Sequence, residues 1–156
     1  MTITEDTITL RKASLADVEA IAALTDAAYE KYIPLIGRKP MPMTADYAKM
    51  AVENEIWLLN VHDQLAGILV LEYEPDTLLI YSVAIQPEYQ KKGLGRRLLA
   101  LAEEQAVQAG YRTIRLYTNA LFEYNLNLYK NLGYHETSRE PFLGSTLVHM
   151  AKMLAG

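Results

Sequence analysis

The chain has 156 residues, no cysteine and a formal net charge of −4, and 51% of its residues are hydrophobic. This length fits one domain, and we expect a single domain over residues 1–156. The missing cysteines exclude disulfides, thiolate metal sites and a cysteine nucleophile, and the acidic balance disfavours nucleic acid as the main partner.

The N-terminal segment and the hydropathy pattern give no signal for export or membrane insertion. The first ten residues, MTITEDTITL, carry two acids and no basic region, so they lack the features of a signal peptide. The longest apolar-looking run, residues 78–85, is far shorter than the roughly 20 residues that a membrane helix needs. We therefore expect a cytoplasmic protein without a membrane partner.

The predicted elements follow the switches between strand-like and helix-like periodicity. In chain order they are a strand over 7–12, a helix over 14–33, a helix over 44–53, strands over 56–61, 65–73 and 77–85, a helix over 93–109, a strand over 113–118, a helix over 121–132, and strands over 134–138 and 146–153. Residues 77–85 are apolar on both faces, which is typical of a central strand covered on both sides. This order predicts a mixed α/β domain around one sheet.

Three local features guide the reading of the N-terminal half. Ser14, with Asp17 three residues later, predicts a capped helix start. Thr44 is the expected cap of the second helix. Between the two helices, IPLIGRKPMPM contains three prolines and one glycine, and we predict no regular structure there.

The segment QKKGLGRRLL, residues 90–99, concentrates four cations and two glycines between a predicted strand and a predicted helix. A helix N-terminus has unpaired N–H groups and a partial positive charge. Glycines let the backbone approach a ligand closely. The segment therefore predicts an anion site, most naturally for phosphate.

Three phosphate-binding motifs can be compared with this segment. The P-loop pattern Gly-x4-Gly-Lys-[Ser/Thr] is absent from the chain. The dinucleotide fingerprint fails at its third glycine position, which is Leu98, and no acid follows at the usual distance of about 20 residues. The pattern Gln/Arg-x-x-Gly-x-Gly/Ala fits in full through Gln90, Gly93 and Gly95. The alternative to a phosphate site is a solvated basic helix start.

With this motif the chain resembles the GNAT superfamily of acyl-CoA-dependent N-acetyltransferases. SVAIQPEYQKKGLGRRLL is similar to the fourth strand and pyrophosphate loop of that family, and NLNLYKNLGY, residues 125–134, is similar to its second signature. The resemblance covers essentially the whole chain. It implies an α/β fold with a mixed, mostly antiparallel central sheet of about seven strands, flanked by about four helices.

The resemblance also implies acetyl-CoA as co-substrate, held in a V-shaped opening between the fourth and fifth strands. The backbone of residues 83–85 would pair with the pantetheine arm, and the amides of residues 91–96 would wrap the pyrophosphate. By this resemblance, the residues expected to bind acetyl-CoA are Val83, Ala84, Ile85, Gln90, Lys91, Lys92, Gly93, Leu94, Gly95, Arg96, Asn125 and Tyr129.

The implied chemistry is direct attack of an amine on the thioester, without an acyl-enzyme and without a metal. A backbone N–H near Val83 would stabilise the oxyanion. Tyr129 matches the tyrosine that hydrogen-bonds or protonates the CoA sulfur in the family, and simple packing is the alternative role for it. Both residues are therefore the catalytic candidates.

The resemblance leaves the general base open. Many family members carry Glu on the fourth or fifth strand, but the corresponding positions here are Tyr81 and Tyr117, which are poor bases at neutral pH. Glu72, Glu30 and Tyr32 are the remaining candidates. A water chain to bulk solvent is the alternative to a protein base.

The acceptor side is predicted from the segment over residues 32–43, which varies with substrate in the family. It would place Arg38 and Lys39 beside the acceptor, where positive charge repels a polyamine and suits an amine that also bears a carboxylate. In the alternative, both cations point to solvent. The candidate acceptor residues are Tyr32, Arg38, Glu72, Tyr81 and Tyr117.

Together these features predict acetyl transfer to a small, amino-acid-like primary amine. A peptide or protein acceptor is one alternative. A non-catalytic acyl-CoA-binding sensor or interaction module is an alternative from another class, and a homodimer is left open. The sequence does not name the acceptor.

Overall fold

Seven strands form one sheet in the computed structural model of the protein, which describes residues 3–154. The strands are β1 (Ile8–Lys12), β2 (Glu55–Val61), β3 (Gln64–Tyr73), β4 (Leu78–Ile85), β5 (Thr113–Asn119), β6 (His135–Phe142) and β7 (Ser145–Met153). Their order across the sheet is β1-β2-β3-β4-β5-β7-β6. Only β4 and β5 pair in parallel, and the other neighbours are antiparallel. The predicted mixed, mostly antiparallel sheet is confirmed.

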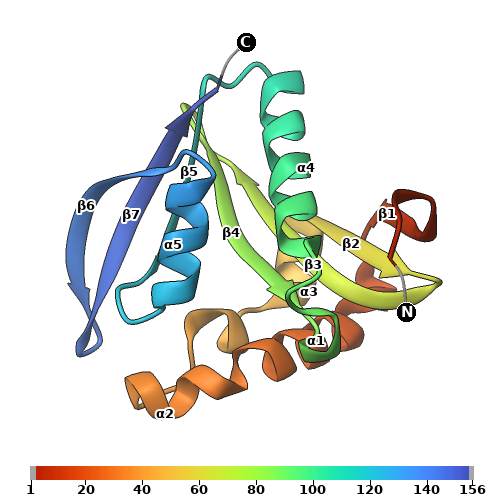
Figure 1. The fold of residues 1–156 in the computed structure, drawn as a ribbon, viewed down its shortest axis with the longest axis horizontal. Coiled ribbons are helices and arrows are strands. Elements are labelled where there is room, and N and C mark those ends of the chain that lie inside the picture. The colour runs from red at the N-terminus through yellow and green to blue at the C-terminus, as the bar shows by residue number, and fades with distance from the viewer. Residues whose placement is uncertain (1–2, 155–156) are drawn as a thin grey trace.

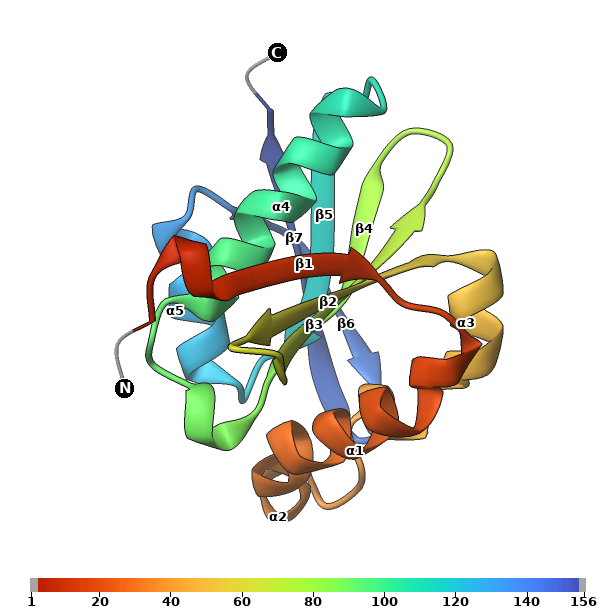
Figure 2. The same cartoon turned by 90° about the vertical axis from the view of Figure 1, so that its right-hand side faces the viewer.

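Helices cover both faces of this sheet (Figures 1 and 2). The helices are α1 (Val18–Tyr29), the single turn α2 (Ile33–Ile36), α3 (Tyr47–Glu53), α4 (Leu94–Gln108) and α5 (Glu123–Asn131). Leu98 of α4 and Leu126 of α5 belong to one buried cluster. Leu24 of α1 and Tyr47 of α3 belong to a second cluster on the opposite face. Within residues 3–154, no helix is long and apolar enough to cross a membrane.

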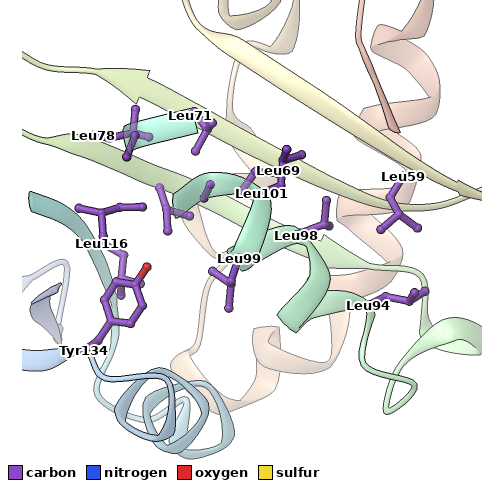
Figure 3. Close-up of a cluster of buried hydrophobic side chains, with 14 of the residues drawn as sticks. Leu59, Leu69, Leu71, Leu78, Leu94, Leu98, Leu99, Leu101, Leu116 and Tyr134 are labelled. Carbon is purple, nitrogen blue, oxygen red and sulfur yellow. The ribbon is translucent and has the colours of Figure 1, made fainter. Parts of the chain in front are cut away.

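The α4 leucines form the centre of the larger cluster (Figure 3). Leu94, Leu98 and Leu101 recur at helical spacing and are buried against the strands. β3 meets this helix at Gly67, where a Cβ atom would lie 2.7 Å from Ile85 Cδ1 and 3.1 Å from Leu98 Cδ1. A residue without a side chain is therefore needed for α4 to lie this close to the sheet.

A bulge in β4 changes which residues of the strand face α4. Val70 pairs with Ser82 but Leu71 pairs with Ile80, so Tyr81 is an extra residue in β4. Before the bulge, Ile80 faces the α4 cluster. After it, Val83 faces that cluster, while Tyr81 packs on the α1 side. The bulge therefore shifts the alternation of the strand by one residue.

Beyond this point β4 and β5 separate. Their parallel pairing covers only Leu78–Ile80 and Ile114–Leu116. The strands then diverge toward the end of the sheet near α1 and α2 (Figure 1). This divergence lies where the family resemblance implied a V-shaped opening.

The proline-rich connection is more regular than its composition predicts. Ile33–Ile36 forms α2 and Met41–Thr44 forms a 3-10 turn. Pro34 is tolerated because it lies in the first turn of α2, where its missing N–H leaves no helix bond unmade. The prediction of Thr44 as the cap of the next helix is also wrong. Asp46 caps α3, since its side chain accepts a hydrogen bond from Lys49 N at 3.1 Å.

Replacing Leu98 tests the role of α4 in the core. Leu98 is completely buried, so Leu98→Ala should lower the free energy of unfolding by about 2–5 kcal/mol through lost apolar contact and an unfilled cavity. Urea unfolding followed by circular dichroism measures this. Val107→Ala on the same helix is the control. Its side chain is partly exposed, so it should change stability by only about 0.5 kcal/mol. Equal losses in both variants would contradict this description of the core.

Candidate active site

The opening between β4 and β5 carries two pockets that meet at four residues. One pocket runs along the start of α4, and we call it the α4 groove. The other is lined by residues of α2 and the loop after it, and we call it the α2 pocket. The residues that line both are Tyr29, Val83, Asn125 and Tyr129, and we call this set the junction.

The α4 groove includes the turn that joins β4 to α4. Lys91 and Gly93 have φ angles of 62° and 83°, and these left-handed conformations turn the chain sharply into the helix. Within α4, the N–H of Arg97 is bonded back to Gly93 O at 3.1 Å. The amides of residues 94–96 precede this bond and lie in the first turn, where N–H groups have no partner within the helix. They are therefore able to donate to an anion in the groove.

The groove is positively charged although the chain as a whole is acidic. Lys31, Lys91 and Arg96 line it, and no Asp or Glu is found among its described lining residues. Gln90 holds the turn in place, because its Nε2 donates to Ile85 O at 3.1 Å and its Oε1 accepts from Lys31 Nζ at 3.3 Å. The partial positive charge of the α4 N-terminus adds to this field. The groove is suited to a polyphosphate.

Gly95 leaves space in this groove. A Cβ atom built on it would meet no heavy atom within 4 Å. Gly95 lies in the first turn of α4 and lines the groove. A side chain there would therefore fill open space in the groove without displacing protein atoms.

Two tyrosine hydroxyl groups and an open strand edge meet at the junction. Tyr29, at the end of α1, donates from its hydroxyl to Val83 O at 3.4 Å. The N–H and C=O groups of one antiparallel strand residue face the same side, so the Val83 N–H also faces the opening. Burial raises the pKa of Tyr29 and Tyr129 above the ordinary value. Both hydroxyls therefore stay protonated at neutral pH.

The α2 pocket is mainly apolar and aromatic. Its described lining contains no Asp, Glu or His, and its one cation is Arg38. The Arg38 side chain donates from Nε to Leu143 O at 3.4 Å and from Nη1 to Lys39 O at 3.3 Å. Its guanidinium carbon lies 5.4 Å from the centre of the Phe142 ring. Arg38 therefore connects the loop after α2 to the tip of the β6–β7 hairpin.

The structure gathers most of the sequence-predicted residues around these pockets. All of the predicted acetyl-CoA-binding residues line the α4 groove except Lys92, which lines a separate hollow beside residues 3–8. Of the candidate acceptor residues, Arg38, Tyr81 and Tyr117 line the α2 pocket. Tyr32 lines the α4 groove instead, and Glu72 lines neither pocket.

Sequence reasoning missed Tyr29, and with it the contribution of α1 to the junction. The spacing of Tyr29 assigned it only to the packed face of a helix. The available signal was a tyrosine among small apolar residues such as Ala22 and Ala28, because a buried tyrosine usually needs a partner for its hydroxyl. That signal indicates a polar contact but does not say with which strand.

Comparison with known sequences gives two informative relatives. The chain is 33% identical to the Xenopus tropicalis protein named "Probable N-acetyltransferase 14" over 100 residues, which cover 62% of this chain and 48% of that protein. It is 28% identical to the Escherichia coli [ribosomal protein bS18]-alanine N-acetyltransferase over 80 residues, which cover 51% of this chain and 54% of the other. The chain thus spans about half the length of the curated relatives it matches.

Solved structures share the fold over nearly the whole chain. The PaiA N-acetyltransferase of Thermoplasma acidophilum, in complex with coenzyme A, superposes with a TM-score of 0.81 at 17% identity and covers 94% of this chain and 99% of its own. The E. coli ribosomal-protein-S18-alanine N-acetyltransferase gives a TM-score of 0.78 at 21% identity and covers 96% of each chain. The model of the acetyltransferase (GNAT) family matches residues 21–134, a span that holds the whole junction, and the chain belongs to this family.

Proposed function

We propose that this protein transfers the acetyl group of acetyl-CoA to the primary amine of a small molecule, by direct attack within a ternary complex. The observation that carries this proposal is the junction, where a groove suited to a polyphosphate meets a second pocket at Val83 and Tyr129. Two substrates that enter from opposite sides would meet there in an oriented encounter. Family membership supports the donor, since solved relatives hold coenzyme A or acetyl-CoA.

In this proposal the α4 groove binds acetyl-CoA. The free amides at the start of α4, with Lys91 and Arg96 beside them, bind the pyrophosphate. The backbone of residues 83–85 lies on the edge of β4 that has no strand partner beyond Ile80, and it pairs with the amides of the pantetheine arm. Gln90 keeps the turn in the conformation that presents these groups.

The acyl transfer then takes place at the junction. The amine nitrogen bonds to the thioester carbon, the C–S bond breaks, and one proton leaves nitrogen while one is gained by sulfur. The Val83 N–H donates to the oxyanion that forms on the carbonyl oxygen. The protonated Tyr129 hydroxyl donates to the leaving sulfur. No covalent protein intermediate is needed.

We propose an amino-acid-like acceptor, bound in the α2 pocket. The lining supports this class, because Arg38 supplies a donor for a carboxylate and no described lining residue offers a carboxylate to a polycation. A peptide acceptor is the second candidate, since one relative is named for an alanine of a ribosomal protein.

Thiol release from acetyl-CoA in the presence of an amine library tests the function. An enzyme releases free CoA only with suitable amines. Tight binding of acetyl-CoA with no release from any amine would contradict the proposal and favour a non-catalytic acyl-CoA-binding module.

Gly95→Val tests the groove. The valine side chain would occupy space in the groove, so we expect CoA binding to weaken about 10-fold in calorimetry, a loss of about 1.4 kcal/mol. Ala100→Val on the same helix is the matched control, because Ala100 lies outside the groove. Wild-type affinity in a folded Gly95→Val variant would remove the groove from consideration.

Tyr129→Phe tests the leaving-group proton. The change keeps the ring and removes only the hydroxyl, and general-acid assistance starts at about 10²-fold. A thiolate is a fair leaving group, so we expect a loss of about this size in kcat. Tyr134→Phe is the control, because that ring packs against Tyr129 but lines neither pocket. An unchanged kcat, with chemistry rate-limiting, would assign Tyr129 to packing.

Arg38→Ala tests the acceptor class. A hydrogen bond to a charged group contributes about 1.5–3 kcal/mol, so KM for a carboxylated acceptor should rise about 10- to 100-fold. KM for the amide of the same acceptor should change much less. If the variant merely loosened the loop, KM would rise for both acceptors. Lys39→Ala is the control: Lys39 is exposed and outside the pocket, so neither KM should change. An unchanged KM for the carboxylated acceptor would contradict this role.

A further inference from the structure

The α2 pocket has no group that could take a proton from an incoming ammonium. Its described lining includes four tyrosines and Arg38 as titratable groups, and no carboxylate or imidazole. Burial raises the pKa of Tyr29, Tyr117 and Tyr129, and it raises that of Tyr81 to about 12. Near neutral pH all four are hydrogen-bond donors rather than bases.

The charged groups behind the pocket wall do not fill this gap. Glu72 of β3 lies close enough to Tyr81 and Tyr117 for its charge to raise their pKa values, but it does not line the pocket. His149 of β7 packs against the Tyr117 ring, and its Nε2 lies 2.8 Å from Glu140 Oε1 of β6. From β5, Arg115 is paired with Glu74 at 2.6 Å. None of these groups is among the described lining residues of the pocket. Glu140 and Glu74 already have partners in His149 and Arg115.

An alkylammonium would therefore be poorly tolerated in the α2 pocket. It would lose hydration among apolar and aromatic side chains without gaining a counter-ion, which is costly for a charged group. The positive charge of Arg38 would oppose it further. A neutral amine avoids both penalties, and its N–H groups can donate to tyrosine hydroxyl oxygens while its lone pair stays free to attack.

We propose that the pocket admits its acceptor as the neutral amine, and so selects weakly basic primary amines, such as the α-amino group of an amino-acid amide or a peptide, over alkylamines and polyamines. This inference rests on the proposed function and narrows its amino-acid-like acceptors to those with a weakly basic α-amino group, which favours a peptide over a free amino acid. The ammonium loses its proton to bulk water before entry. Inside, the neutral nitrogen loses one proton as sulfur gains one, so the transfer balances without a protein base.

The test compares two acceptors that share a phenyl ring. Phenylalaninamide carries an α-amino group, with a pKa near the usual value of about 7.7–8.0, and phenethylamine carries an alkylamine, with a pKa near about 10.4. With wild-type enzyme, log kcat/KM should rise with unit slope and level off near pH 8 for phenylalaninamide. For phenethylamine it should still be rising at pH 9.5. At pH 7, kcat/KM should be about 300-fold higher for phenylalaninamide than for phenethylamine, which is the ratio of the fractions of the two amines that are neutral.

Two variants complete the test. Glu72→Gln and His149→Asn should leave the break in each profile where it is, because neither side chain reaches the acceptor. A break at one common pH for both acceptors, or one that moves in either variant, would reveal a protein base and overturn this inference alone. Absence of thiol release with any amine would overturn the proposed function, and this inference with it.

Discussion

The separation of β4 from β5 is the constraint on which the rest of the site depends. Pairing ends at Ile80 and Leu116, and from there the inner edge of β4 has lost its strand neighbour. Backbone groups at the centre of a sheet need partners. Tyr29 supplies one for Val83 O and Gln90 supplies one for Ile85 O, while the Val83 N–H faces the opening. The strand edge that is unpaired in the protein is thus the one that can pair with an extended ligand.

The bulge at Tyr81 makes this edge usable. Without the extra residue, the alternation that places Ile80 toward α4 would turn Val83 to the other face of the sheet. With it, Val83 packs on the α4 side while Tyr81 forms part of the wall of the α2 pocket. The inserted residue Tyr81 therefore separates two segments of β4. The segment up to Ile80 packs in the core, and the segment that follows contributes Val83 to the junction.

Local pattern was sufficient for much of the fold and for most of the residues that line the α4 groove near the turn. Apart from β6, the strands, α4 and α5 were predicted nearly to their bounds, because their apolar periodicity is strong and Gly93 and Gly133 flank the helices. The strand predicted over 134–138 runs on to Phe142, because β6 is almost wholly exposed and carries no apolar pattern to mark its end. The turn from Gln90 to Gly95 was predicted as an anion site because its glycines and cations are contiguous in sequence, and it lines the α4 groove. Of the four junction residues, Tyr29 was not predicted. It comes from α1 and contacts Val83, which lies 54 residues later in the sequence. The α2 pocket was predicted only in part, through Arg38, Tyr81 and Tyr117, because its wall is drawn from α1, α2, β4, β5, α5, β7 and the loops between them.

The absence of acidic residues from the described lining of both pockets fits a single reaction. The chain has more acids than bases, yet no acid lines either pocket among the described residues. In the α4 groove this leaves the cations and the helix N-terminus unopposed for an anion. In the α2 pocket it leaves an environment that disfavours an ammonium and keeps the tyrosine hydroxyls protonated. The burial that makes Tyr129 a poor base also makes it a dependable donor at the junction. In the proposed function, these donors assist the leaving thiolate and stabilise the oxyanion, and the acceptor must arrive as the neutral amine.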